Sequence, residues 1–128
     1  MKTLYLCGPI NGCTDKECTN WREIVKSIWK GETLDPMRRD YRGKEDESVV
    51  DIVEFDKIDI MNSDALIVSY DKPSVGTSME ILYAFERGKI VVVVAATGAR
   101  MSPWMRYHSH RITSTYASAV QIIQSLLH

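Results

Sequence analysis

The chain has 128 residues, a formal net charge of −1 and 45% hydrophobic residues, a composition typical of one globular domain over residues 1–128. The small charge argues against a nucleic-acid polymer as partner, and the longest apolar run, Ile90–Ala96, is too short to cross a membrane. Three cysteines without a CxxC pair, and an N-terminus without a signal-peptide pattern, favour a protein of the reducing cytoplasm.

The first half of the chain alternates between strand-like and helix-like segments. An apolar run predicts a strand over Thr3–Cys7, and apolar residues at helical spacing predict a helix over 16–30. A weak short strand over 32–35 is followed by a charged segment over 37–47, which we predict to be a long loop. Helical periodicity returns over Val49–Met61.

The second half continues this alternation. A buried strand is predicted over Ala65–Tyr70, a helix over Ser78–Arg87, and a continuous β-branched strand over Ile90–Ala96. The C-terminal part then predicts a loop, a short strand and an amphipathic helix, over residues 97–110, 111–115 and 116–127.

The order of these elements predicts an α/β domain with a doubly wound, mostly parallel five-stranded sheet of the Rossmann or flavodoxin type. Ligands of such sheets bind outside the carboxyl ends of the strands. The segments at that edge are GPINGCTD, DPMRRD, YDKPSVGT and ATGARMSPW. We therefore expect the functional residues in these loops and in the helix starts that follow them.

One acidic residue, Glu80, lies within the apolar segment SVGTSMEILYAF. The run Thr77–Glu80 fits the capping-box pattern S/T-x-x-E, in which the glutamate bonds back to the helix start. The same carboxylate is also a candidate to face a substrate, and near a helix N-terminus we expect it to be ionised. Both interpretations stay open on these residues alone.

A second carboxylate, Asp56, lies on the apolar face of the predicted helix over 49–61. Because successive helical residues rotate by about 100°, Asp56 shares that face with Val49, Ile52, Val53 and Ile60. An inward carboxylate needs a partner or a cleft, since burial of an unpaired charge is costly. Asp56 therefore either forms a structural pair or lines a site.

Glu80 and Asp56 are expected at the same edge of the sheet. Paired carboxylates suit reactions at an acetal carbon, where one carboxylate captures an oxocarbenium-like centre and the other assists. Tyr5 either hydrogen-bonds such a carboxylate or packs in the core. Gly76 and Thr77, just before a helix, offer backbone N–H groups to a phosphate or carboxylate.

Neither a metal nor a cofactor is expected. The histidines show no metal-ligand spacing with acids or cysteines. The sequence contains no GxGxxG and no Walker A motif, so neither a dinucleotide site nor an ATP site is indicated.

An ordered set of segments resembles the nucleoside 2-deoxyribosyltransferase family: YLCGPING followed by WR, then DPMRRD, DIVEFDKIDIMNSDALIV, PSVGTSMEILYAFERGKIVVVV and SPWMRYHS. The resemblance extends from Tyr5 to about His108. It implies that Glu80 attacks the anomeric carbon of a deoxyribonucleoside, that Asp56 binds the sugar and assists, and that Tyr5 positions the nucleophile. It also implies a homodimer or larger homo-oligomer with shared active sites.

Ser74 stands where many transferases of the family carry an aspartate. A related branch, the 2′-deoxynucleoside 5′-monophosphate N-glycosidases, has serine there and binds a phosphate. That branch also has a serine, matching Ser102, that comes from a neighbouring subunit. Its first-loop serine and arginine, however, are Pro9 and Asn11 here. Serine in place of a carboxylate removes like-charge repulsion of a 5′-phosphate, which independently favours a nucleotide.

We therefore predict hydrolysis of the N-glycosidic bond of 2′-deoxyribonucleosides or, preferably, their 5′-monophosphates, through a covalent intermediate on Glu80. The alternatives are base exchange on free deoxynucleosides and a non-catalytic nucleotide sensor. A phosphoribohydrolase is less favoured because the second glycine of a GGxGTxxE loop is missing. The predicted substrate-binding residues are Gly8, Ile10, Asn11, Ser74, Gly76, Met79 and Ser102.

Overall fold

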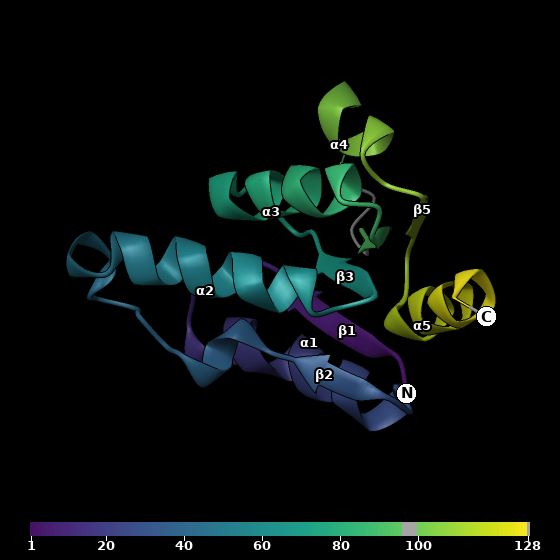
Figure 1. Cartoon of the computed structure of the whole chain (residues 1–128), viewed down its shortest axis with the longest axis horizontal. Coiled ribbons are helices and arrows are strands. Elements are labelled where there is room, and N and C mark those ends of the chain that lie inside the picture. Colours follow the sequence, from purple (N-terminus) through teal and green to yellow (C-terminus); the bar gives the residue numbers. More distant parts are fainter. Residues whose placement is uncertain (96–99, 128) are drawn as a thin grey trace.

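A computed structural model describes residues 1–95 and 100–127 and contains one parallel sheet between two layers of helices (Figure 1). The strands are β1 (Thr3–Cys7), β2 (Glu32–Leu34), β3 (Ala65–Ser69), β4 (Ile90–Val94) and β5 (Arg111–Thr113). The helices are α1 (Asp15–Ile28), α2 (Val49–Met61), α3 (Val75–Glu86), α4 (Pro103–Tyr107) and α5 (Tyr116–Leu126), with 3-10 turns η1 (Pro36–Arg38) and η2 (Glu45–Glu47). None of the described helices is long and apolar enough to span a bilayer.

The sheet has the order β2-β1-β3-β4-β5, and each neighbouring pair is parallel. This confirms the predicted doubly wound α/β fold. The chain leaves β1 for β2 on one side and then crosses to β3 on the other side of β1. The carboxyl ends of β1 and β3 therefore flank the point at which the winding reverses, where ligands of this architecture bind.

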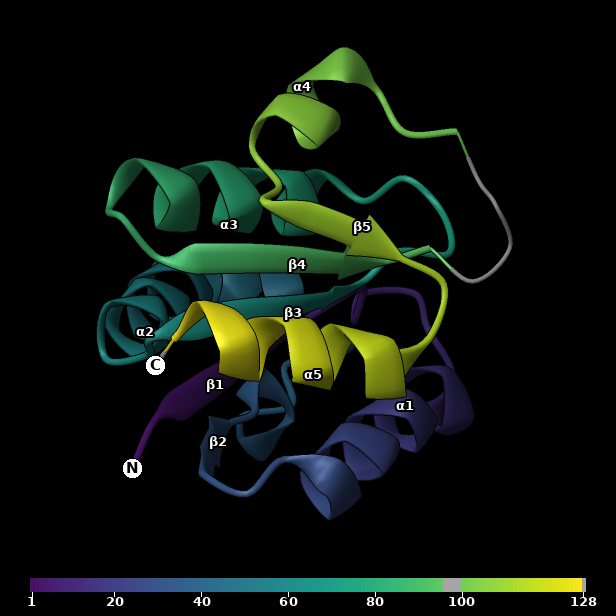
Figure 2. The same cartoon turned by 90° about the vertical axis from the view of Figure 1, so that its right-hand side faces the viewer.

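The two faces of the sheet are covered by different helices: α1 and α5 pack on one face, and α2 and α3 on the other (Figures 1 and 2). Side chains of a strand alternate between the faces. In β1, Leu4 and Leu6 therefore pack under α1 and α5, whereas Tyr5 and Cys7 point to the side of α2 and α3. All four are fully buried, and burying a large apolar side chain contributes roughly 1.5–3 kcal/mol.

Helix α3 begins three residues before its predicted start. Ser74 caps it, because the Ser74 hydroxyl accepts a hydrogen bond from the Thr77 backbone N–H (3.3 Å). This rules out the capping-box interpretation of Thr77–Glu80, one of the two left open by the sequence, and Glu80 lies in the second helical turn. A serine followed by a second Ser/Thr pair gave two possible starts, and the local sequence does not decide between them.

The loop predicted over 97–110 contains the short helix α4. Its start has a serine cap and a proline at the first helical position, a combination that favours helix initiation. The end of the predicted strand at Ala96 and the start of this loop lie outside the described residues.

The predicted apolar face of α2 is buried only in part. Ile60 is 1% exposed, but Val49 and Val53 are 59% and 44% exposed, so the prediction was wrong for these two valines. Figure 1 shows the reason, since the N-terminal end of α2 extends beyond the strands. The C-terminal half packs on the sheet, and there Asp59 is buried beside Ile60.

Candidate active site

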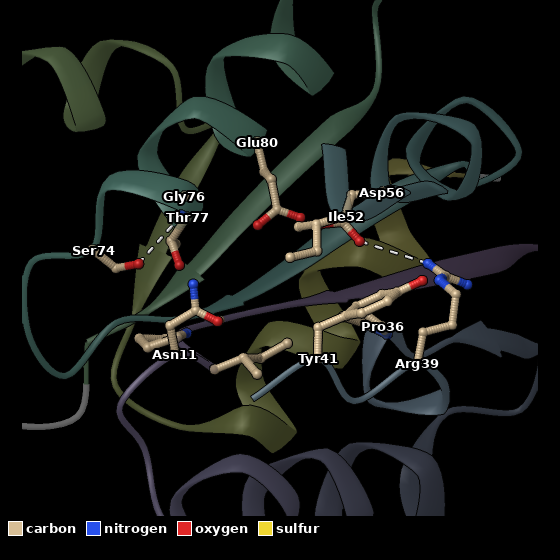
Figure 3. A pocket seen from close by; sticks show the side chains of 13 residues that line it. Asn11, Pro36, Arg39, Tyr41, Ile52, Asp56, Ser74, Gly76, Thr77 and Glu80 are labelled. Atoms are coloured by element: carbon tan, nitrogen blue, oxygen red, sulfur yellow. Dashed lines mark hydrogen bonds and ion pairs between the residues drawn. The ribbon is translucent and has the colours of Figure 1, made fainter. Parts of the chain in front are cut away.

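A cleft with a volume of about 140 Å³ opens at the carboxyl ends of β1 and β3. It is formed by the loop after β1, the loop after β2, one side of α2 and the first turns of α3 (Figure 3). Its lining residues are Gly8, Pro9, Ile10, Asn11, Pro36, Arg39, Tyr41, Ile52, Asp56, Ser74, Gly76, Thr77 and Glu80. The cleft thus brings together most of the predicted site residues from four separate segments.

Glu80 lies in the middle of the cleft, and its carboxylate faces β1 (Figure 3). The Tyr5 hydroxyl donates a short hydrogen bond to one carboxylate oxygen, and the Cys7 thiol lies 3.9 Å from the other. Tyr5 and Cys7 are two residues apart on one strand, so both point to the same face. Tyr5 is therefore a partner of Glu80 in addition to being buried, and Cys7 is a contact that the sequence analysis missed.

Asp56 lies beside Glu80, and the two carboxylates have raised pKa values. Burial raises the pKa of Glu80 to about 8, with the charge of Asp56 as the next cause. Burial also raises the pKa of Asp56 to about 6, although Arg39 opposes this shift. The expectation that the helix N-terminus keeps Glu80 ionised is thus wrong, because desolvation and Asp56 outweigh the dipole.

Coupled acids share their protons, so Asp56 and Glu80 together carry one proton when the pH lies between these two pKa values. Burial also raises the pKa of Tyr5 well above its ordinary value, with the charge of Glu80 adding to the effect. Tyr5 therefore stays a neutral phenol that donates to the carboxylate. A donor of this kind favours the ionised form of Glu80, but burial and the charge of Asp56 together outweigh it.

One end of the cleft is suited to an anion. Ser74, Gly76 and Thr77 form the first turn of α3, where backbone N–H groups and the helix dipole favour negative charge. Thr77 is 2% exposed, and its hydroxyl has no hydrogen-bond partner among the described residues. Figure 3 shows this hydroxyl on the side of the cleft where the Asn11 amide lies.

The loop after β1 forms the floor at this end, with Gly8 and Ile10 in the lining. Buried Arg22 fixes the loop by donating to the Gly8 carbonyl (3.2 Å). A Cβ atom at Gly8 would lie 2.8 Å from the Trp21 ring, so glycine permits the close approach of the loop to α1.

The other end of the cleft contains residues that sequence reasoning missed. Arg39 and Tyr41 come from the charged loop after β2, and Pro36 and Ile52 complete an apolar wall (Figure 3). The position of DPMRRD after a strand signalled that the loop borders the site. Its mixed charges and lack of periodicity gave no indication of which side chains face inward.

Two predicted substrate-binding residues lie outside this cleft. Met79 lines a neighbouring groove of about 420 Å³ between α2 and α3, which shares Asp56 and Glu80 with the cleft. Ser102 is exposed at the start of α4, where its hydroxyl accepts from the Met105 N–H (3.3 Å). Within residues 1–95 and 100–127, no three histidine, cysteine or acidic residues are grouped as a metal site would require.

Comparisons with known proteins agree with this architecture. The family profile described as nucleoside 2-deoxyribosyltransferase matches residues 4–121. No curated protein matches the chain in sequence.

Several solved structures share the fold at low sequence identity. A 2-deoxyribosyltransferase from Bacillus psychrosaccharolyticus superposes with a TM-score of 0.80 at 15% identity, covering 98% of this chain and 95% of that one. A conserved protein from Enterococcus faecalis V583 gives 0.75 at 16% identity, with 99% of each chain covered. The CMP N-glycosidase BcmB of Clostridium botulinum gives 0.58 at 18% identity, with 96% and 99% covered. Since the profile covers nearly the whole domain, the chain belongs to the nucleoside 2-deoxyribosyltransferase family of enzymes.

Proposed function

We propose that this enzyme hydrolyses the N-glycosidic bond of 2′-deoxyribonucleoside 5′-monophosphates through a covalent intermediate on Glu80. The observation that carries the proposal is the Glu80 carboxylate, held by Tyr5 in the middle of a cleft, with Asp56 beside it. Two structural relatives support the reaction class, because one is a deoxyribosyltransferase and the other a CMP N-glycosidase. Both break or exchange a bond between a base and a sugar.

The reaction uses the form of the pair in which Glu80 is ionised and the one shared proton lies on Asp56. In the first step, a carboxylate oxygen of Glu80 attacks C1′ of the sugar. The C1′–N bond breaks, its electron pair leaves with the base, and the base takes a proton from Asp56. In the second step, Asp56 accepts a proton from water, and the water oxygen bonds to C1′. The ester bond then breaks and the Glu80 carboxylate is restored.

Tyr5 supports both states of the nucleophile. Its hydroxyl donates to the free carboxylate, orients it toward the cleft and favours the ionised form. When an ester forms at one oxygen, the carbonyl oxygen of that ester can keep the same donor. Tyr5 is thereby assigned a positioning role and is not itself consumed.

The residues at the α3 end of the cleft support the assignment of the 5′-phosphate to this end. Ser74 brings a hydroxyl where a carboxylate would repel the phosphate, and Gly76 leaves the backbone N–H groups accessible. Thr77 adds a buried hydroxyl that lacks a protein partner among the described residues. At the opposite end, Tyr41, Pro36 and Ile52 offer an apolar wall for the leaving base. Glu80 lies between the two ends (Figure 3).

A panel of ribo- and deoxynucleosides and their 5′-monophosphates, assayed for free base by chromatography, tests the proposal. We expect the deoxynucleoside monophosphates to release base, and Glu80→Ala to abolish release. A nucleoside carrying a second, added base as the main product would instead identify a base-exchanging transferase. Nucleotide binding without turnover in the wild type and in Glu80→Ala would identify a sensor.

Ser74→Asp tests the phosphate end separately. The added carboxylate should reduce turnover of monophosphates far more than turnover of free deoxynucleosides, because it repels the phosphate. Unchanged monophosphate turnover in this variant would contradict the assignment of Ser74 to the phosphate.

We further propose that the enzyme works as a homodimer or larger homo-oligomer with shared sites. Exposed apolar side chains lie on three neighbouring helices, including Val50 of α2, Met79 of α3 and Trp104 of α4, which are 72%, 66% and 73% exposed. Ser102 lies outside its own cleft, at the exposed start of α4 beside Trp104, and we assign it to the cleft of a second copy. Mixing Glu80→Ala with Ser102→Ala should restore activity if sites are shared, and a monomer in light scattering would contradict the proposal.

A further inference from the structure

Asp59 is a buried acid of α2, and the proposed reaction does not use it. It lies one helical turn after Asp56 on α2 and is 6% exposed. Arg38 donates hydrogen bonds to both carboxylate oxygens of Asp59, at 3.1 and 3.0 Å, and Arg39 donates to one of them at 2.7 Å. A carboxylate buried to this extent is stable only with such charged partners.

Arg39 connects this buried acid to the cleft. Its Nη2 atom lies 2.7 Å from Asp59 and 3.6 Å from Oδ1 of Asp56 (Figure 3 marks the second contact). Arg39 also lines the cleft, whereas Arg38 is not a lining residue and, in the described part of the chain, forms no ion pair with Asp56. The two arginines are adjacent in sequence and bind one acid, but only Arg39 reaches the proposed proton donor.

We propose that Asp59 and Arg39 are positioning residues for Asp56, with Asp59 fixing the Arg39 guanidinium beside the Asp56 carboxylate and so setting when that carboxylate is protonated. The proposal rests on the function proposed above, because it assigns these residues to the proton that the leaving base takes. Arg38 anchors Asp59 without contributing directly to Asp56.

Four groups act on the charge of Asp56 from the elements around it. Arg39 from the loop after β2 favours the ionised form, and Asp59 from the same helix disfavours it. Tyr5 from β1 favours the ionised form through a hydrogen bond, and Glu80 from α3 carries a second negative charge when it ionises. Arg39 and Asp59 have opposite effects, so removal of Arg39 should raise the pKa of Asp56 and removal of Asp59 should lower it.

The test compares the pH profile of kcat/KM for a deoxynucleoside monophosphate in four proteins: wild type, Arg39→Met, Asp59→Asn and Arg38→Met. The acidic limb combines the first ionisation of the Asp56–Glu80 pair with the second ionisation of the substrate phosphate, and the phosphate contribution is the same in all four proteins. We expect Arg39→Met to move this limb upward by about half a pH unit, the size of a partly exposed ion pair. Asp59→Asn keeps an oxygen acceptor for Arg39 but removes a negative charge beside Asp56, so it should move the limb downward. Arg38→Met should leave the limb in place.

The matched arginines separate a positioning role from a structural one. If both arginine variants move the limb equally, or if Arg39→Met only lowers the rate at every pH, the proposal is overturned. Arg39→Lys keeps the positive charge and should restore most of the wild-type limb. Should Asp59→Asn fail to fold, the pair of arginine variants still decides the role of Arg39.

A second readout is independent of turnover. Carbon-13 NMR of aspartate-labelled protein, with the Asp56 signal assigned by its loss in Asp56→Asn, gives the titration of this carboxyl directly. We expect the same upward shift in Arg39→Met and none in Arg38→Met. If the wild type releases no base from any substrate, the proposed function fails, while this titration still confirms or contradicts the role of Arg39.

Discussion

Thr77→Val separates substrate binding from folding at the α3 end of the cleft. Thr77 is buried, lines the cleft and has a hydroxyl with no partner among the described residues. Valine has the same shape and a similar helix propensity, so the change removes one hydroxyl and little else. A buried polar group without a partner costs about 1–3 kcal/mol. The variant should therefore be more stable than the wild type by about 1 kcal/mol.

The same change should weaken catalysis on monophosphates. A hydrogen bond to a charged group contributes about 1.5–3 kcal/mol. Loss of one from Thr77 to the phosphate should thus lower kcat/KM by about tenfold to hundredfold. Free deoxynucleosides carry no phosphate, so their kcat/KM should fall by much less. A stability gain combined with this substrate-dependent loss is not expected from a residue with a purely structural role.

Denaturant unfolding and steady-state assays on both substrate classes measure the two effects. A gain of about 1 kcal/mol raises the melting temperature of a domain of this size by a few degrees. Ser78→Ala is the matched control, because the Ser78 hydroxyl already donates to the Ser74 carbonyl (2.8 Å) and Ser78 is not a lining residue. A destabilised Thr77→Val, or equal losses on nucleosides and monophosphates, would refute the reasoning.

Three further predictions follow from contacts in the cleft. Tyr5→Phe removes the donor to Glu80, so the basic limb of the kcat/KM profile should move to higher pH. Because the folded-state pKa of Glu80 is raised, protonated Glu80 contributes fully to the free energy of unfolding below a pH of about 4.5, and this contribution is lost as the pH rises through about 8. The free energy of unfolding, measured from pH 5 to 8, should show this decline. Glu80→Gln should flatten it. Gly8→Ala should lower the unfolding free energy by about 1–3 kcal/mol, because its Cβ meets the buried ring of Trp21; an unchanged melting curve would contradict this.

The β1 strand shows what the sequence can predict about the site. Its bounds, Thr3–Cys7, agree with the prediction, and alternation along a strand already places Tyr5 and Cys7 on one face. The strand is buried on both sides, so its residues are apolar throughout and the pattern does not indicate which face carries α3. Tertiary packing decides that Tyr5 and Cys7 lie beneath Glu80, and the hydrogen bond follows from that packing.

The two ends of the cleft differ in how far they could be predicted. Gly76 and Ser74 carry a local signal, since glycine and serine before an apolar helix are typical of an anion-binding helix start. Arg39 and Tyr41 carry none, because their loop has mixed charges and no period. Asp59 was equally hidden: it follows Asp56 on the same side of the helix, but only the position of the two arginines makes it a buried ion-pair partner.

The raised pKa of Glu80 has a consequence for the free energy of unfolding. An acid kept in a capping box or a surface ion pair stabilises the fold, and its removal lowers the unfolding free energy. Glu80 instead lies beside a second acid in a desolvated cleft, so at neutral pH its environment opposes ionisation. Glu80→Gln should therefore raise stability near pH 8 while abolishing base release. Loss of stability in that variant would indicate that Glu80 serves the fold, and the proposed nucleophile would have to be abandoned.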